Sequence, residues 1–337
     1  MKFNRNIARI AVGAALITCQ AAALAQSASA ALFDGHVAAG LPQAFSLPRP
    51  EDDERGPGVD QVVVEEKLET DVVYPDGSHA VTYTGTANGL EATFTRIGDA
   101  LAIDAFEEKP AADMTALAGL TAAPEPDDVV APPWADTFAA PHVTGNTTST
   151  PSELQFWIFL HNQSGESNYA KFHNWYIGWW VRDMERTVKP GIPVKVFIKD
   201  RIAGVTDFDY DQGTNAEALI RFRTVSNDYL TSVGAVPSSL TKTMLFVDRR
   251  PQNWGGDGVY GVALPRDTVA IASGTGPRHI IAHEFGHTLD ARHEHGELRF
   301  PCVTNMRGYE VPYYSCRIYS GHNDTLIRNY VRRELDQ

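Results

Sequence analysis

The eleven-residue string His-Glu-Phe-Gly-His-Thr-Leu-Asp-Ala-Arg-His at 283–293 restricts the fold more than any other part of the chain. The segment from Gly276 onwards predicts an α-helix, because a Gly-Pro pair starts it and apolar side chains then recur at steps of four. These apolar residues are Ile281, Phe285 and Leu289. Four residues along a helix return to within about 40° of the starting direction, so His283 and His287 share the opposite face.

Two histidines on one helix face can bind the same zinc ion at about 2.1 Å, while Glu284 lies beside them without being a ligand. A straight helix would carry His293 about 9 Å past His287 and onto another face, so the helix has to end first. The turn belongs at Asp290, because aspartate is one of the few residues with a side chain that tolerates positive φ. The spacing therefore predicts a site in which His283, His287 and His293 bind zinc and Glu284 is the general base.

Two further histidines lie close to this string. His279 comes one turn before His283, and His295 comes two residues after His293, so we interpret both as neighbours of the site and not as ligands. The competing interpretation is that all these histidines only cap or solvate a helix. It leaves unexplained why three of them have the spacing that one ion requires.

The string resembles the signature of the metzincin metallopeptidases, His-Glu-x-x-His-x-x-Gly-x-x-His followed by a methionine-containing turn. Met306 stands thirteen residues beyond the third histidine, and Asp290 stands where the family has glycine. The stretches Tyr313-Tyr314-Ser315-Cys316 and Tyr319-Ser320-Gly321 are similar to bacterial reprolysin-like members, including the peptidyl-Asp metallopeptidases. The resemblance covers roughly residues 150–337.

The resemblance implies a zinc endopeptidase of protein or peptide substrates, with Met306 as an apolar floor beneath the zinc. It also implies an edge strand that pairs with an extended substrate, expected here at 258–264, where glycines allow close backbone approach. The residues of that strand expected at the substrate are Gly258, Val259, Tyr260, Gly261 and Val262.

Some metzincins add a tyrosine after the turn as a switchable ligand, and Tyr309 is the candidate for this role. The segment after the turn lines the specificity pocket in the family. Arg307 or Arg317 can bind a carboxylate there, which predicts a preference for an acidic side chain just after the cleaved bond. The alternative is that both arginines are only solvated charges.

Three functions remain open at this point. The first is an active endopeptidase, the second is a catalytically weak zinc domain that only binds protein, and the third is a zinc hydrolase of cell-wall peptides or small substrates. Glu284 argues against the second, because a binding module needs no general base. The expected edge strand argues against the third.

The first 30 residues have the form of a signal peptide, with a basic start, a short apolar run at 10–25 and small residues suited to cleavage. A membrane anchor would need a longer run, and a lipid-modified Cys19 would need a small residue before it. We expect a protein that passes through the periplasm and is secreted, without a further membrane segment.

Cysteine usage agrees with export, because only Cys302 and Cys316 remain after the signal. An even pair in an oxidising compartment predicts a disulfide. The alternative, a zinc-binding cysteine pair, is weaker because three histidine ligands lie just upstream. Residues 31–301 contain no cysteine, which excludes a thiolate that keeps the enzyme latent.

The chain divides into four parts by composition. After the signal comes the segment 31–110, in which residues 60–106 alternate apolar and polar positions around turn sequences and predict a small antiparallel β unit. In a secreted peptidase this unit suits a pro-segment, and a permanent accessory domain is the alternative. Residues 111–150 are rich in Ala and Pro and indicate an exposed connector. Residues 151–337 alternate strands and helices and predict an α+β catalytic domain, a mixed twisted sheet with covering helices.

The helix expected at 168–189 carries an aromatic stripe of Phe172, Tyr176 and Trp179, with Trp175 beside it. The stripe could be a sugar-binding platform, but aromatics at helical spacing are more often core, and we favour the core interpretation.

The net charge and the acidic clusters indicate which further partners and cofactors to expect. The formal net charge is −13 and no basic run is dense enough to follow phosphates, so we expect no nucleic acid partner, and we expect a monomer. Asp207, Asp209 and Asp211 resemble a calcium loop, although the glycine comes one place late and the closing glutamate is absent. A solvated acidic turn is the alternative.

Overall fold

The computed structural model describes residues 28–49, 58–106, 152–189, 191–250, 259–300, 302–307 and 314–336. The chain divides into two compact units. The first comprises Met1–Leu68 and Ala80–Glu107, and the second comprises Glu69–His79 and Glu108–Gln337. The chain before the connector therefore contributes to both units, because residues 69–79 belong to the second.

The first unit is an antiparallel sheet in which neighbouring strands are joined in the order β1-β2-β4-β5-β6. The strands are β1 (Gln43–Pro48), β2 (Val59–Lys67), β4 (His79–Ala87), β5 (Leu90–Ile97) and β6 (Ala100–Ala105). Phe33, from a helix over residues 28–38, is buried among apolar side chains of these strands. Asn88 and Gly89 both have positive φ and form the tight hairpin turn between β4 and β5. The predicted antiparallel β unit is confirmed.

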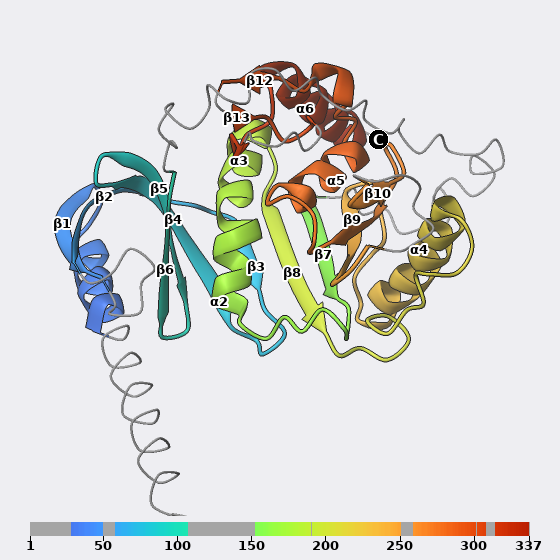
Figure 1. Ribbon diagram of the computed structural model, residues 1–337, viewed down its shortest axis with the longest axis horizontal. Helices are drawn as coiled ribbons and strands as arrows, with labels where there is room; N and C mark the ends of the chain where they lie inside the picture. Colours follow the sequence, from blue (N-terminus) through green and yellow to red (C-terminus); the bar gives the residue numbers. More distant parts are fainter. Residues whose placement is uncertain are drawn as a thin grey trace, which may run out of the picture. The chain divides into compact units, whose positions relative to one another are not determined.

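The second unit contains a mixed sheet in the order β3-β8-β7-β9-β11-β10 (Figure 1). Its strands are β3 (Asp71–Val73), β7 (Leu154–Leu160), β8 (Val194–Asp200), β9 (Thr241–Val247), β10 (Gly261–Ala263) and β11 (Val269–Ser273). Every neighbouring pair is parallel except β10 with β11. The predicted mixed sheet is confirmed.

The second unit also holds the helices and a small sheet. The helices are α2 (Tyr169–Phe172), a π-helical turn (His173–Ile177), α3 (Gly178–Val188), α4 (Asn215–Ser232), α5 (Ile280–Thr288), a 3₁₀ turn (His293–His295) and α6 (Gly321–Leu335). The small sheet joins β12 (Leu298–Arg299), β13 (Cys302–Val303) and β14 (Tyr314–Ser315). In the described part of the chain, no helix is both long and apolar enough to cross a membrane.

Helices cover both faces of the large sheet, because successive side chains of β7 point in opposite directions. Phe159 packs with Phe222 of α4 on one face. Phe156 contacts Trp180 of α3 and Phe285 of α5 on the other, with ring centroids 4.8 and 4.7 Å apart. Figure 1 shows α3 and α5 together in front of the strands. The α+β fold, with helices on both sides of the sheet, is confirmed.

The helix predicted at 168–189 forms as α2 and α3 joined by the π-helical turn. Phe172, Tyr176 and Trp179 are buried, so the core interpretation of the aromatic stripe is confirmed. Trp175 is 48% exposed, and the guanidinium of Arg278 lies 4.6 Å from its ring centroid.

Candidate metal centre

Helix α5 is held at both its apolar stripe and its carboxyl end. The predicted stripe residues Ile281, Phe285 and Leu289 are fully buried. Lys242 of β9 donates its Nζ to the Thr288 carbonyl at 2.8 Å, which satisfies an acceptor at the end of the helix. Burial lowers the pKa of Lys242 to about 7. The helix that carries two of the three histidines therefore has little freedom to shift.

The chain turns sharply at Asp290, as the sequence predicts. Asp290 has a φ of 70°, and its amide donates to the His287 carbonyl. The Ala291 amide donates to the Gly286 carbonyl at 2.9 Å, so the helix ends in a Schellman motif with aspartate in the position that usually holds glycine. The Asp290 carboxylate also contacts the Arg292 guanidinium at 3.3 Å. The turn returns the chain towards α5.

The Nε2 atoms of the three histidines converge. They lie 3.3 Å apart between His283 and His287, and His293 is 2.9 Å from each of the others. Three nitrogens that bind one zinc ion tetrahedrally at about 2.1 Å would be about 3.4 Å apart. Among the residues that the structure describes, this is the one group of His, Cys, Asp or Glu side chains that could share an ion. The donor set fits zinc.

The two helical histidines are arranged as neutral ligands. His283 Nδ1 lies 2.7 Å from the Asn305 carbonyl, which can only accept, so Nδ1 carries the proton and Nε2 keeps its lone pair. Burial lowers the pKa of His283 well below its usual value, and the neighbouring histidines lower it further. Burial likewise lowers the pKa of His287 to about 3. Both rings are therefore ready to bind a cation near neutral pH.

Glu284 is buried against the strand expected to bind substrate. A side chain at Gly261 of β10 would overlap the Glu284 carboxyl group. The glycine is thus needed at this position to leave room for the glutamate. Sequence reasoning attributed the glycines to close approach of a substrate, and the structure adds this second reason for Gly261.

Met306 packs against α5 at Gly286, which lies between His283 and His287 in the chain. It is fully buried, and a side chain at Gly286 would overlap its sulfur atom and lie 3.0 Å from the Tyr319 ring. Arg307 closes a tight turn around the methionine by donating its amide to the Thr304 carbonyl at 2.9 Å. The expected methionine turn and α5 are therefore in direct contact.

A buried carboxyl group on α3 supports this turn and was missed by sequence reasoning. Asp183 Oδ2 accepts the Tyr319 amide at 2.8 Å and lies 3.4 Å from the Asn305 side-chain amide. The Tyr319 hydroxyl in turn donates to the Ala282 carbonyl at 2.5 Å. Burial raises the pKa of Asp183 to about 8. No local pattern marks Asp183, because its partners lie more than 100 residues away in the chain.

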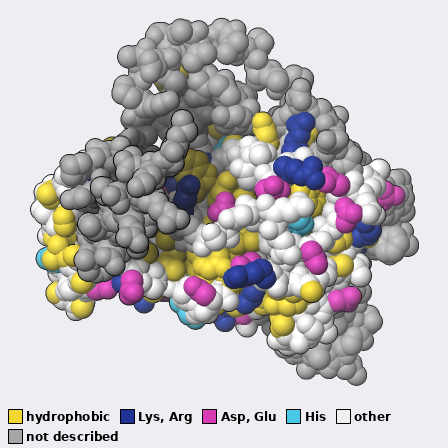
Figure 2. Space-filling model, turned by 60° about the horizontal axis from the view of Figure 1, so that its bottom comes forward, with side chains coloured by type: hydrophobic (Ala, Val, Ile, Leu, Met, Phe, Trp, Pro, Cys, Tyr) yellow, Lys and Arg dark blue, Asp and Glu magenta, His cyan; other side chains and the backbone are white. Residues whose placement is uncertain are grey.

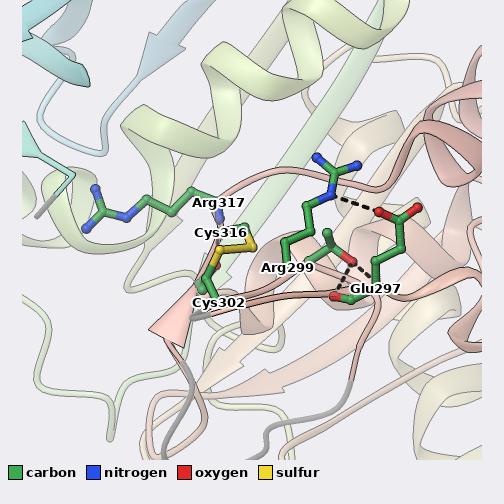
Figure 3. The surroundings of a disulfide bond; sticks show 7 residues. Glu297, Arg299, Cys302, Cys316 and Arg317 are labelled. Atoms are coloured by element: carbon green, nitrogen blue, oxygen red, sulfur yellow. Dashed lines mark hydrogen bonds and ion pairs between the residues drawn. A yellow bond between two sulfur atoms is a disulfide. The ribbon is translucent and has the colours of Figure 1, made fainter. Parts of the chain in front are cut away.

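Cys302 and Cys316 are joined, which confirms the predicted disulfide. Figure 3 shows the bond beside the Glu297–Arg299 ion pair, whose atoms are 2.8 Å apart, with the Arg317 side chain extending to the opposite side. The bond closes the segment that contains Met306. It therefore links β13, which precedes the turn, to the residue directly after β14.

Removing this disulfide is expected to destabilise the second unit. The Cys302→Ser, Cys316→Ser double variant should lose about 3 kcal/mol of unfolding free energy, because the crosslink closes a loop of about 15 residues in the unfolded chain. Urea unfolding followed by tryptophan fluorescence reports on this unit, since the four tryptophans that the structure describes lie in it: Trp157, Trp175, Trp179 and Trp180. An unchanged midpoint and slope would show that the crosslink contributes nothing.

The remaining candidates are placed as follows. Val259 and Tyr260 precede β10, while Val262 is a buried residue of that strand. Gly258 and Tyr309 lie outside the described residues. His279 is buried with its ring centroid 6.2 Å from that of His283, and His295 stacks on His322, so neither joins the convergent group.

The calcium prediction finds no support. Asp207 accepts the Gly204 amide, Asp209 accepts the Asp211 amide, and the Asp211 carboxylate contacts Arg249 at 2.9 Å. These carboxylates organise a loop with protein donors.

Comparisons with known proteins do not assign this chain to a family. The sequence matches no protein-family model and no curated protein. Among solved structures it is similar to metalloproteinase-II from Bacteroides fragilis, with 16% sequence identity and a TM-score of 0.46, over 88% of this chain and 94% of that chain. Likeness at this level decides neither the family nor the reaction.

Proposed function

We propose that the protein is a secreted, zinc-dependent endopeptidase of the metzincin type. One observation carries the proposal: three buried or half-buried imidazoles converge on one point, and a buried glutamate follows the first of them on the same helix. A structural zinc site would normally have four protein ligands, whereas three leave a position open for chemistry.

The chain's own residues would divide the reaction as follows. Zinc bound by the three histidines would supply a Lewis acid that polarises the scissile carbonyl and acidifies water. Glu284 would accept a proton from the attacking water and then deliver it to the departing amine. Asn305 would keep the His283 ring oriented through its carbonyl. Met306 would support α5 from below.

A peptide substrate could bind along β10. This strand is the last in its sheet order, and among the described strands it pairs only with β11. A free strand edge binds an extended peptide through main-chain hydrogen bonds. Gly261 places this edge directly beside Glu284. This arrangement supports an endopeptidase over a hydrolase of small substrates.

Surface charge is consistent with a protein substrate. On the face drawn in Figure 2, Lys and Arg side chains occur in small groups among Asp and Glu side chains. A nucleic-acid-binding surface would instead gather basic residues into a stripe.

The decisive test is cleavage of a peptide library by the purified protein, with and without a zinc chelator. We expect internal peptide bonds to be cut, activity to be lost on chelation, and activity to return when zinc is restored. Binding of peptides without cleavage would favour the protein-binding alternative, and cleavage of cell-wall peptides alone would favour the other hydrolase.

The amino-terminal region also leads to a prediction about maturation. We propose that residues 1–30 are a signal peptide and that the chain carrying the metal centre begins, in the active secreted form, in the connector at about 111–150, because exposed Pro- and Ala-rich segments are preferred sites of proteolysis. Amino-terminal sequencing of the secreted protein tests this. An active single chain that still begins before Val62 would rule out cleavage of the connector.

Specificity is expected to depend on one of two arginines. Arg317 follows Cys316 directly, and Arg307 lies in the turn that contains Met306. If one of them binds an acidic side chain just after the cleaved bond, its replacement by alanine should erase the preference for Asp or Glu and spare cleavage at apolar sites. Cleavage profiling of both variants measures this. A preference for bulky apolar residues in the unmodified enzyme would make both arginines bystanders.

A further inference from the structure

The segment 69–79, which precedes the connector, is built into the sheet of the second unit. Its strand β3 pairs with β8 in parallel, with Val72 opposite Val196 and Val73 opposite Phe197. β7 occupies the other side of β8. Without β3, the β8 edge would lose its partner and expose unpaired backbone groups.

A buried carboxylate on α3 binds the backbone just before β3. Glu185, only 4% exposed, accepts the Glu69 amide at 3.0 Å, the Thr70 amide at 3.0 Å and the Thr70 hydroxyl at 2.8 Å. Lys189 Nζ contacts the same carboxylate at 2.7 Å. Burial raises the pKa of Glu185, but these partners outweigh it and lower the pKa. Loss of the segment would remove three hydrogen bonds from a buried charge, which is costly.

The segment is also anchored after β3. Tyr74 is buried, and its hydroxyl lies 2.8 Å from Nδ1 of His173 in the π-helical turn. The chain then reverses, because the Tyr74 amide donates to the Ser78 carbonyl and Gly77 takes a φ of 81°. Val72, Tyr74 and His173 are all buried, so the segment fills space inside the second unit and does not rest on its surface.

We propose that residues 69–79 remain bound to the second unit after the connector is cut, so that the processed protein is a complex of two chains. The amino-terminal chain would then be a permanent partner, held by β3, Glu185 and Tyr74. This inference does not depend on the reaction that the metal centre catalyses. Cleavage of the connector alone would therefore not release the amino-terminal chain.

The test is a controlled cut in the full-length protein. A recognition sequence for a site-specific protease is inserted within 111–150, in a Glu284→Gln background that prevents self-cleavage, and the protein is then cut and passed through a sizing column. We expect the two pieces to elute together and to separate only in denaturant. Hydrogen exchange should show the Glu69 and Thr70 amides protected at least about 100-fold relative to an unstructured chain, because both donate to a buried carboxylate.

Two variants show whether segment 69–79 holds the complex together. Val72→Asp places a charge in the buried strand and should speed dissociation of the cut complex more than tenfold, whereas Val59→Asp, at a valine that is 53% exposed in β2, should not. Glu185→Gln preserves shape but not charge and should speed dissociation about tenfold. It is the deciding variant if Val72→Asp fails to fold.

Two results would overturn the proposal. One is separation of the two pieces on the column under native conditions, with the Glu69 and Thr70 amides exchanging like those of a free chain. The other is a complex that persists with the same dissociation rate in both variants, because it would then be held together elsewhere.

Discussion

Replacing Glu284 with glutamine is expected to lower kcat/KM for peptide cleavage by about 10²–10⁴-fold, the range that proton transfer by a positioned side chain contributes. Glutamine has nearly the same shape but cannot take a proton from water at neutral pH. Because Glu284 is not among the convergent ligands, zinc content should stay near that of the unmodified protein. Peptide kinetics and elemental analysis of the same preparation measure both quantities.

Glu294→Gln is the matched control for this variant. It makes the same chemical change next to His293, on a side chain that is 64% exposed and that contacts only Arg292 and His295 in the ion pairs found. Its activity should stay within about twofold of the unmodified protein. The assigned mechanism is wrong if Glu284→Gln keeps most of its activity, or if it loses activity only because zinc is lost.

Replacing His293 with alanine is expected to weaken zinc binding by more than about 100-fold, the upper end of the loss seen when only an outer-shell partner is removed. His293 supplies one of three converging nitrogens, 2.9 Å from each of the other two. Two histidines on a helix would leave the ion with too few protein ligands. Zinc affinity is measured by competition with a chromophoric chelator, and peptidase activity should fall in parallel.

His295→Ala is the control for this ligand variant, because it removes an imidazole only two residues away. The His295 ring stacks on that of His322 with centroids 3.5 Å apart, and His295 is not part of the convergent group. Zinc affinity should therefore be unchanged. If His295→Ala and His293→Ala weakened zinc binding equally, the third ligand would be misassigned.

Local patterns in the sequence were sufficient for much of the site. The four-residue repeat of apolar side chains located α5, because helix geometry relates residues four apart regardless of the rest of the fold. The requirement that His293 return to the other two histidines placed the positive φ at Asp290, since a continuous helix would carry His293 away from them. The expectation of export and an even cysteine count were likewise enough to predict the disulfide.

The same patterns left out elements without a strong periodic or motif signal. Helix α6 was not predicted, although its Ser320 side chain accepts the Asn323 amide as an N-cap. The interruption of the 168–189 helix by a π-helical turn was not visible either. One extra residue per turn changes which side chains face the sheet but leaves composition untouched.

Long-range contacts were decided only by the tertiary structure. The sequence assigned residues 31–110 to one β-rich segment, yet residues 69–79 join the sheet of the second unit. Strand pairing depends on which edge is free in the folded chain, and the alternation that predicts a strand does not name its partner. The same holds for Asn305 at His283 and for Glu185 at Thr70. Such hydrogen bonds join residues far apart in the chain, so local sequence determined which three histidines converge while packing determined what holds them in place.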